Sequence, residues 1–312
     1  MVQIHLPLPN LILLSNSNTQ SPIYINKGIM LINTLDLKDK TIFHEINTPD
    51  NFNVFSIMDY STNKMGICQK INNGITSTLD YCKINENLIL VSYVPSVIDK
   101  IVVKTLSING TDIKAGPLYT LDERTATNKI SIIGLNDSTF IVCYNDNTNK
   151  CAKAIAIHIE DDRISTISNT LLLKGIIHEI RAVKVEENEM AVFLQFDKVG
   201  IVQLVKFVEG NKLVKVEEQV FYTGSDLYNL TIASMHKYHV VAFLNSAHML
   251  VLKILETSPK VKFTQGMQFN KRIINDYFQL ISIDNEMVLC YFNDIVQIIS
   301  LNNGQIMQPE DI

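Results

Sequence analysis

A polar turn followed by an apolar run recurs along most of this chain. Each run holds four to six apolar residues and usually closes on an aromatic side chain. The runs end at Tyr93, Tyr144, Leu194, Phe243 and Tyr291, at intervals of 51, 50, 49 and 48 residues. Five copies at so regular a spacing indicate a structural repeat of about fifty residues.

The repeat can be divided into four short strands. Turn-forming Asn and Asp residues separate the apolar stretches, and no segment combines a helical period with helix caps. In the copy that ends at Tyr144, the predicted strands are 130–135, 139–144, 152–159 and 164–173. In the copy that ends at Phe243, they are 230–234, 240–244, 249–255 and 261–268.

A lone four-stranded sheet cannot bury either face, whereas sheets stacked radially bury both and leave only short edges. The central strands then need apolar residues on both sides, and runs such as Leu88–Val91 and Phe140–Cys143 meet that need. We therefore predict an all-β fold: a single β-propeller of four-stranded blades, with seven blades, or six as the alternative. A β-sandwich or two small β domains are the competing architectures, but neither requires this period.

The expected blades divide the whole chain, 1–312, as one domain. Residues 1–76 fit the repeat least well, because they hold either two short blades or one blade with an insertion. Residues 29–33 resemble a second strand, 52–58 and 65–69 resemble a first and second strand, and residues 2–6 are candidates to close the last blade. The expected blades are 1–50, 51–76, 77–126, 127–177, 178–227, 228–275 and 276–312.

Composition narrows the class of protein. The chain is 46% hydrophobic and 19% charged, a normal globular balance, and its 312 residues can bury a large core. The net charge of −5 argues against nucleic acid as a partner. The five cysteines show no paired spacing, so we predict reduced core thiols rather than disulfides or metal ligands.

The expected compartment is intracellular, or a virion if the source is a virus. The N-terminal sequence lacks the basic region of a signal peptide, and no apolar stretch is long enough to span a bilayer. We therefore expect a soluble cytoplasmic protein with no membrane insertion.

Candidate chemistry is sparse. No phosphate loop, nucleophile elbow, dinucleotide fingerprint or zinc-hydrolase motif occurs, so we predict no catalytic residue, no metal site and no cofactor. His236 and His239 are expected to be solvated turn residues. Three arginines are candidates for binding an anion near the mouth of a propeller: Arg124 and Arg272 from equivalent loops, and Arg181 from an inner strand.

The repeat resembles β-propeller blades in general, over about residues 77–312. The chain has no Trp and no diglycine, so it lacks the marks of WD40 and kelch repeats, and the sialidase box is also missing. It is similar to the divergent propellers of fungal-type lectins and of virion- or tail-associated proteins.

Three functions remain open. The absence of a catalytic constellation favours a non-enzymatic interaction or structural module, a rigid scaffold that binds a protein partner or joins a larger assembly. The first alternative is a glycan-binding lectin, in which Tyr would replace the usual Trp. The second is a hydrolase with its site at the central channel, which requires converging carboxylates or the three arginines around the axis.

Overall fold

The structure is a computed structural model, and every described element in it is a strand. It describes residues 33–37, 40–47, 52–59, 64–65, 69–70, 76–95, 100–122, 127–160, 163–209, 211–224, 226–235, 238–257, 262–273, 278–282, 287–292, 295–302 and 305–307. No helix long and apolar enough to cross a bilayer occurs in this described part.

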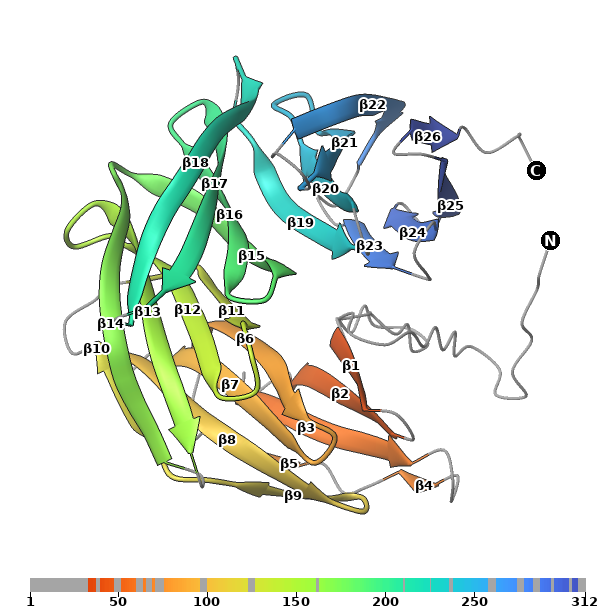
Figure 1. Cartoon of the computed structure of the whole chain (residues 1–312). Coiled ribbons are helices and arrows are strands. Elements are labelled where there is room, and N and C mark those ends of the chain that lie inside the picture. The colour runs from red at the N-terminus through yellow and green to blue at the C-terminus, as the bar shows by residue number, and fades with distance from the viewer. Residues whose placement is uncertain are drawn as a thin grey trace.

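The described strands form six antiparallel sheets that follow one another along the chain (Figure 1). Sheet A contains β1 (Asn33–Leu37), β2 (Lys40–Asn47), β3 (Phe52–Asp59), β4 (Lys64–Met65) and β5 (Gln69–Lys70). Sheet B contains β6 (Thr76–Asn85), β7 (Leu88–Pro95), β8 (Ile101–Asn109), β9 (Asp112–Ala115) and β10 (Tyr119–Asp122).

The next four sheets each have four strands in chain order. Sheet C contains β11 (Ile130–Gly134), β12 (Thr139–Asp146), β13 (Cys151–Glu160) and β14 (Arg163–Lys174). Sheet D contains β15 (Ile177–Glu186), β16 (Glu189–Phe196), β17 (Val199–Val208) and β18 (Lys212–Thr223). Sheet E contains β19 (Tyr228–Ser234), β20 (Tyr238–Leu244), β21 (Met249–Glu256) and β22 (Lys262–Arg272), and sheet F contains β23 (Phe278–Ser282), β24 (Met287–Phe292), β25 (Ile295–Asn302) and β26 (Gln305–Met307).

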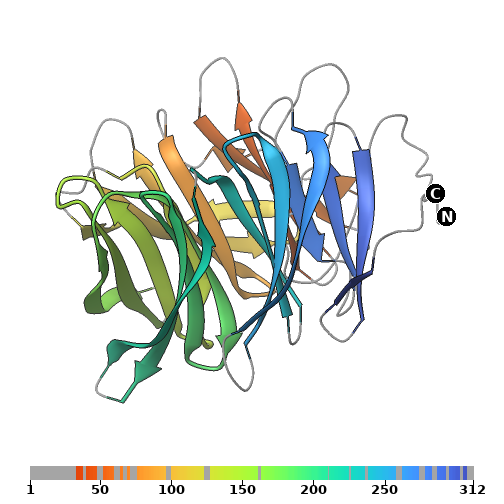
Figure 2. The same cartoon turned by 90° about the horizontal axis from the view of Figure 1, so that it is seen from above.

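The sheets are arranged around an axis as the blades of a propeller. The first strands of neighbouring sheets contact one another, from β1 and β6 through β11, β15 and β19 to β23. Figure 1 looks along this axis, with the later strands of each sheet toward the rim, and Figure 2 shows successive sheets stacked side by side. The chain is thus a divergent β-propeller, as the repeat predicts.

The predicted strands agree with the observed ones to within a few residues at each end. In sheets C and E, all eight predicted strands occur, and each pairs antiparallel with the next. The agreement follows from the pattern itself, because apolar runs as short as these, bounded by turn residues, favour buried strands over helices.

The N-terminal region differs from the expected division. Strands β2 and β3 pair along their whole length, from Lys40 opposite Asp59 to Asn47 opposite Phe52. The expected boundary between blades 1–50 and 51–76 therefore lies inside one sheet, and residues 52–58 form a third strand rather than a first one. Residues 2–6 and 29–32 lie outside the described residues, so the choice between six and seven blades stays a prediction.

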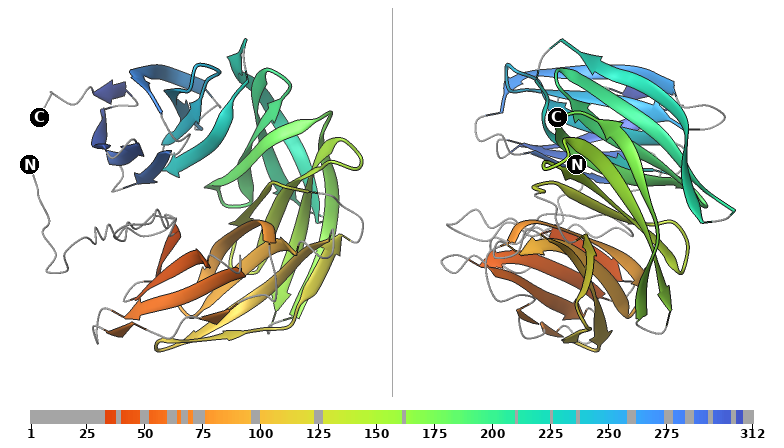
Figure 3. Two further views of the ribbon diagram at one scale, coloured as in Figure 1. Left: turned by 180° about the vertical axis from the view of Figure 1, so that it is seen from behind. Right: turned by 90° about the vertical axis from the view of Figure 1, so that its left-hand side faces the viewer.

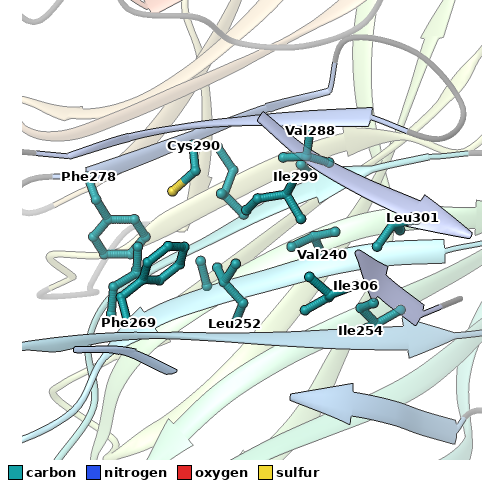
Figure 4. Close-up of a cluster of buried hydrophobic side chains, with 14 of the residues drawn as sticks. Val240, Leu252, Ile254, Phe269, Phe278, Val288, Cys290, Ile299, Leu301 and Ile306 are labelled. Atoms are coloured by element: carbon teal, nitrogen blue, oxygen red, sulfur yellow. The ribbon is translucent and has the colours of Figure 1, made fainter. Parts of the chain in front are cut away.

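The hydrophobic core lies between neighbouring blades. All eight residues of β12 are buried, because its two faces pack against the sheets on either side. Figure 4 shows one such layer, in which Val240 and Leu252 of sheet E face Val288 and Ile299 of sheet F. Burying apolar side chains on both faces of each sheet is the main stabilising contribution to this architecture.

The described cysteines behave as small core residues. Cys143, Cys151 and Cys290 are buried free thiols, and Cys82 is partly buried. Burial raises the pKa of Cys143 and of Cys290 to about 12, so these thiols stay protonated and unreactive at neutral pH.

Candidate functional site

Three polar residues occupy the same place in successive inner strands. The second strand of each sheet carries the apolar run of the repeat. Asp80 of β6, Ser131 of β11 and Arg181 of β15 each pair with the next-to-last residue of that run. The repeat therefore brings a carboxylate, a hydroxyl and a guanidinium to one level beside the axis.

Each of these side chains links its own blade to a neighbour. The Ile132 N–H donates to Asp80 Oδ2 at 2.9 Å, and the Ala182 N–H donates to Ser131 Oγ at 3.0 Å. Arg181 donates from Nε to the Leu230 carbonyl at 3.2 Å and from Nη1 to the Ile130 carbonyl at 3.4 Å. We call Asp80, Ser131 and Arg181 the inner-strand latches, because they join sheets B, C, D and E.

Two of the three candidate arginines, Arg181 and Arg272, lie within the described residues. Arg181 lies on the inner strand of sheet D, and its two hydrogen bonds described here go to backbone carbonyls. Arg272 is the exposed last residue of β22, the outermost strand of sheet E. Arg124 lies outside the described residues, and anion binding at these arginines stays a prediction.

Two further polar contacts lie where the inner strands begin. Lys129 Nζ forms an ion pair with the buried Glu179 of the next sheet at 2.7 Å. The amide of Asn145, also buried, accepts hydrogen bonds from Thr127 Oγ1 and the Lys129 N–H and donates one to the Ile177 carbonyl. The signal for Asn145 in the sequence is an amide directly after an apolar run, a pattern that also marks ordinary turns.

Asp146 organises the hairpin turn between β12 and β13. Its carboxylate accepts from the Asn149 N–H at 2.9 Å and pairs with Lys153 at 2.6 Å. Burial alone would raise the pKa of Asp146, but the hydrogen bonds from Lys153 and Asn149 outweigh it and lower that pKa.

The prediction of a solvated His239 is wrong. The side chain is buried in β20, and its Nδ1 lies 3.1 Å from Ser234 Oγ on the paired inner strand. Burial lowers the pKa of His239 to about 4, so the ring is neutral at physiological pH. His236 lies outside the described residues, and no group of His, Cys, Asp or Glu within the described ranges could hold a metal ion.

The outer rim carries apolar side chains that are open to solvent. Val214, Val216 and Val220 of β18 are 45%, 57% and 52% exposed, and Leu171 of β14 is 49% exposed. Strands β14 and β18 contact one another, and the right-hand view of Figure 3 looks onto this side of the molecule. We call Leu171, Val214, Val216 and Val220 the rim patch.

A second exposed feature lies at one end of sheet E. The rings of Tyr228 and His248 stack with centroids 5.8 Å apart and planes 3° apart, and Tyr228 is 40% exposed. The Ile273 N–H donates to the His248 carbonyl at 2.8 Å, so the backbone of Arg272 runs beside this pair. We call Tyr228 and His248 the aromatic pair.

The fold and these surfaces define the class: a β-propeller without a described catalytic constellation. No protein-family model and no curated relative matches the chain. Its structure is similar to that of the SapL1 lectin in complex with alpha methyl fucoside, with a TM-score of 0.57 and 12% identity over 90% of this chain and 97% of that one.

Three other solved structures are also similar to this chain. AofleA from Arthrobotrys oligospora has a TM-score of 0.58 and 10% identity, over 87% of this chain and 81% of that one. Kluyveromyces lactis Hsv2 has a TM-score of 0.54 and 11% identity, over 89% and 85%. A prolyl endopeptidase matches at 0.52 and 8%, but only 38% of its chain is covered. At these identities the likeness shows the propeller fold alone.

Proposed function

We propose that this chain is a non-enzymatic interaction module that binds a protein partner through the rim patch. The observation that carries this proposal is the exposure of Val214, Val216 and Val220 along one outer strand, which contacts the outer strand that carries the exposed Leu171. Scattered exposed aliphatic residues are common, but four of them on two outer strands in contact concentrate apolar area at the rim, and a partner that covers this area gains free energy.

The polar groups near the axis support the same assignment. The described contacts of Ser131 and Arg181 hold blades together, and Glu179 forms an ion pair with Lys129. These side chains are thus used for structure, whereas a hydrolase at the channel would need carboxylates that face a substrate.

Site-specific photo-crosslinking tests the proposal. A benzoyl-phenylalanine side chain replaces Val216 of the rim patch or, as the control, the exposed Asp112 of β9, in the cells that naturally express the chain. We expect a discrete crosslinked protein for position 216 and none for position 112. Equal crosslinking at both positions, or none at position 216, would contradict the proposal.

Glycan binding is the second candidate, because the aromatic pair favours it. The half-exposed ring of Tyr228 offers an apolar face for the C–H groups of a sugar, and the backbone of Arg272 runs next to that pair. The similarity to a fucoside-bound lectin adds weight to this candidate.

A glycan array with the purified protein tests this candidate. Binding that Tyr228→Ala reduces at least tenfold, and that Val216→Ser leaves unchanged, would support it. Absence of binding to every glycan on the array, or equal binding by Tyr228→Ala, would remove it.

A further inference from the structure

We propose that one face of the propeller binds membranes that contain anionic lipids. In sheets C, D and E, this face is formed by the turns between the second and third strands and by the connections that follow the fourth strands. We call it the connection face. The rim patch lies along the outer strands instead, so membrane binding goes beyond the proposed function.

A repeated backbone contact lies on the connection face. The Gly175 N–H donates to the Lys150 carbonyl at 2.7 Å in sheet C, and the Gly224 N–H donates to the Lys198 carbonyl at 3.3 Å in sheet D. In sheet E, the carbonyl of His248 accepts the corresponding bond. The three sheets have the same strand order from the axis to the rim, so these turns lie on one face of the ring, which Figure 2 shows edge-on.

The exposed charges of the connection face are mostly basic. Lys150 and Lys198 lie on the turns, and Lys174 and Arg272 are the last residues of β14 and β22. The exposed carboxylate described on this face is Asp197. The three lysines form no ion pair with another described residue, so they are available to the acidic headgroups of lipids.

The other carboxylates described at this face are withdrawn from its surface. Asp146 and Glu179 are buried, and they pair with Lys153 and Lys129. Asp226 is partly buried. The net charge of the whole chain is −5, but salt screens charges that lie more than about 10 Å away, so the local lysines dominate the attraction to a surface that touches them.

The opposite face of the same three sheets carries charges of both signs. Its exposed carboxylates include Asp137, Glu160, Glu186, Glu187 and Glu209, and its exposed cations include Arg163, Lys184, Lys206, Lys212 and Lys262. An anionic surface would meet repulsion as well as attraction there. The connection face is therefore the favoured side for an anionic partner.

Exposed apolar groups lie among the lysines of the connection face. Ile176, between β14 and β15, is 47% exposed, and Tyr228, which stacks on His248 at the start of β19, is 40% exposed. An aliphatic side chain can enter the boundary between headgroups and acyl chains, and a tyrosine combines an apolar ring with a polar hydroxyl. A soluble polyanion would use the lysines alone, whereas an anionic membrane uses both kinds of group.

Co-sedimentation of the purified chain with vesicles tests the proposal. The vesicles contain phosphatidylcholine with about one third phosphatidylserine, or phosphatidylcholine alone, in about 0.1 M salt. We expect binding to the anionic vesicles that weakens as salt is added. Binding to phosphatidylcholine alone should be at least roughly tenfold weaker, because each lysine near an anionic surface contributes about fivefold.

Two variants separate the charged and apolar contributions. The triple variant Lys150→Gln, Lys174→Gln and Lys198→Gln should weaken binding at least roughly twentyfold. Ile176→Ser should weaken it about fivefold, because the part of this side chain that is open to water would no longer be buried in the membrane. Circular dichroism and the melting temperature of each variant verify that it is folded.

The matched control is the triple variant Lys206→Gln, Lys212→Gln and Lys262→Gln. It makes the same change in net charge with exposed lysines of the opposite face, so binding should stay within about twofold of the original. No binding to anionic vesicles, equal binding to phosphatidylcholine alone, or equal effects of the two triple variants would overturn the proposal.

The Ile176→Ser variant also distinguishes a membrane from an acidic protein as the partner. Full binding by this variant would mean that charge alone attracts the vesicles, which fits an acidic protein surface, and it would overturn the membrane as the occupant. The crosslinking test of the rim patch uses another surface of the molecule, so either test can fail without the other.

Discussion

At the scale of single residues, some polar side chains have structural roles that the sequence around them does not predict. Arg181 contacts two other sheets, and His239 is neutral inside β20. Both residues are surrounded in the sequence by ordinary strand patterns. Their roles come from groups that the fold brings beside them, and both roles can be measured.

Protonation of His239 should destabilise the fold at mildly acidic pH. The pKa of its ring is about 4 in the folded chain and about 6.5 when unfolded, so between these values the unfolded state binds a proton that the folded state does not. We expect the free energy of unfolding to keep its full value above about pH 6.5. It should fall by about 3 kcal/mol as the pH drops to about 4.

Denaturant titrations between pH 7.5 and pH 4 would show this loss. His239→Asn should remove the part of this pH dependence that comes from the uptake of about one proton on unfolding. His178→Asn, at an exposed position of β15, is the control and should leave the slope unchanged. An identical slope in His239→Asn and the unaltered protein would contradict the assignment.

Removing the Arg181 guanidinium should weaken the inner-strand latches. Arg181→Met keeps much of the aliphatic length but leaves the Leu230 and Ile130 carbonyls without these donors, which we expect to cost about 2–3 kcal/mol in the free energy of unfolding. Arg163→Met, at the exposed start of β14, should cost less than about 0.5 kcal/mol. Equal losses in urea titrations of the two variants would show that the latch contributes nothing specific.

At the scale of the elements, close packing between strand ends constrains the turns. Gly175 follows β14 with φ of +128°, and a Cβ atom there would overlap the ring of Phe196. Gly110 lies in the turn between β8 and β9 with φ of +60°, and a Cβ atom there would meet open space. The two glycines thus differ in packing while both adopt positive φ.

Alanine substitutions separate these two effects. Gly110→Ala should cost about 1 kcal/mol, because only the left-handed backbone is penalised. Gly175→Ala should cost about 3 kcal/mol or more, since overpacking against Phe196 adds to that penalty. Melting curves of the two variants provide the comparison, and similar losses would mean that Phe196 moves away freely.

At the scale of the whole molecule, stability is divided between neighbouring blades rather than held in one central core. The buried side chains form separate clusters between successive sheets, and the second strands of sheets B, C, D and E each contribute to the clusters on both of their faces. An outer strand contributes less to either cluster, because many of its residues are exposed. Resistance to local opening should therefore fall from the centre of each sheet toward the rim.

Hydrogen exchange would show this gradient within sheet C. We expect the amides of β12, which is wholly buried, to exchange only through global unfolding. The amides of β14, which is largely exposed, should exchange faster through partial opening of the rim. Equal protection of β12 and β14 would contradict the division of stability proposed for the blades.

The sequence by itself determined the strands, their antiparallel order and the propeller repeat. These follow from local patterns, because an apolar run and the turn that bounds it lie within a few residues of each other. It also indicated reduced core cysteines, and the described thiols agree. In sheet A, where the repeat is weak, the pattern misplaced a blade boundary that the pairing of β2 with β3 corrected.

Only the tertiary structure decided which polar residues join the blades and which face solvent. The latch at Asp80 meets Ile132, 52 residues away, and the latch at Ser131 meets Ala182, 51 residues away. These separations equal one repeat, so the partners become neighbours only when the blades pack around the axis. The exposure of Val216 could likewise not be predicted from the sequence. Outer and inner strands share the same alternation of apolar and polar residues, and they differ only in whether another sheet covers them.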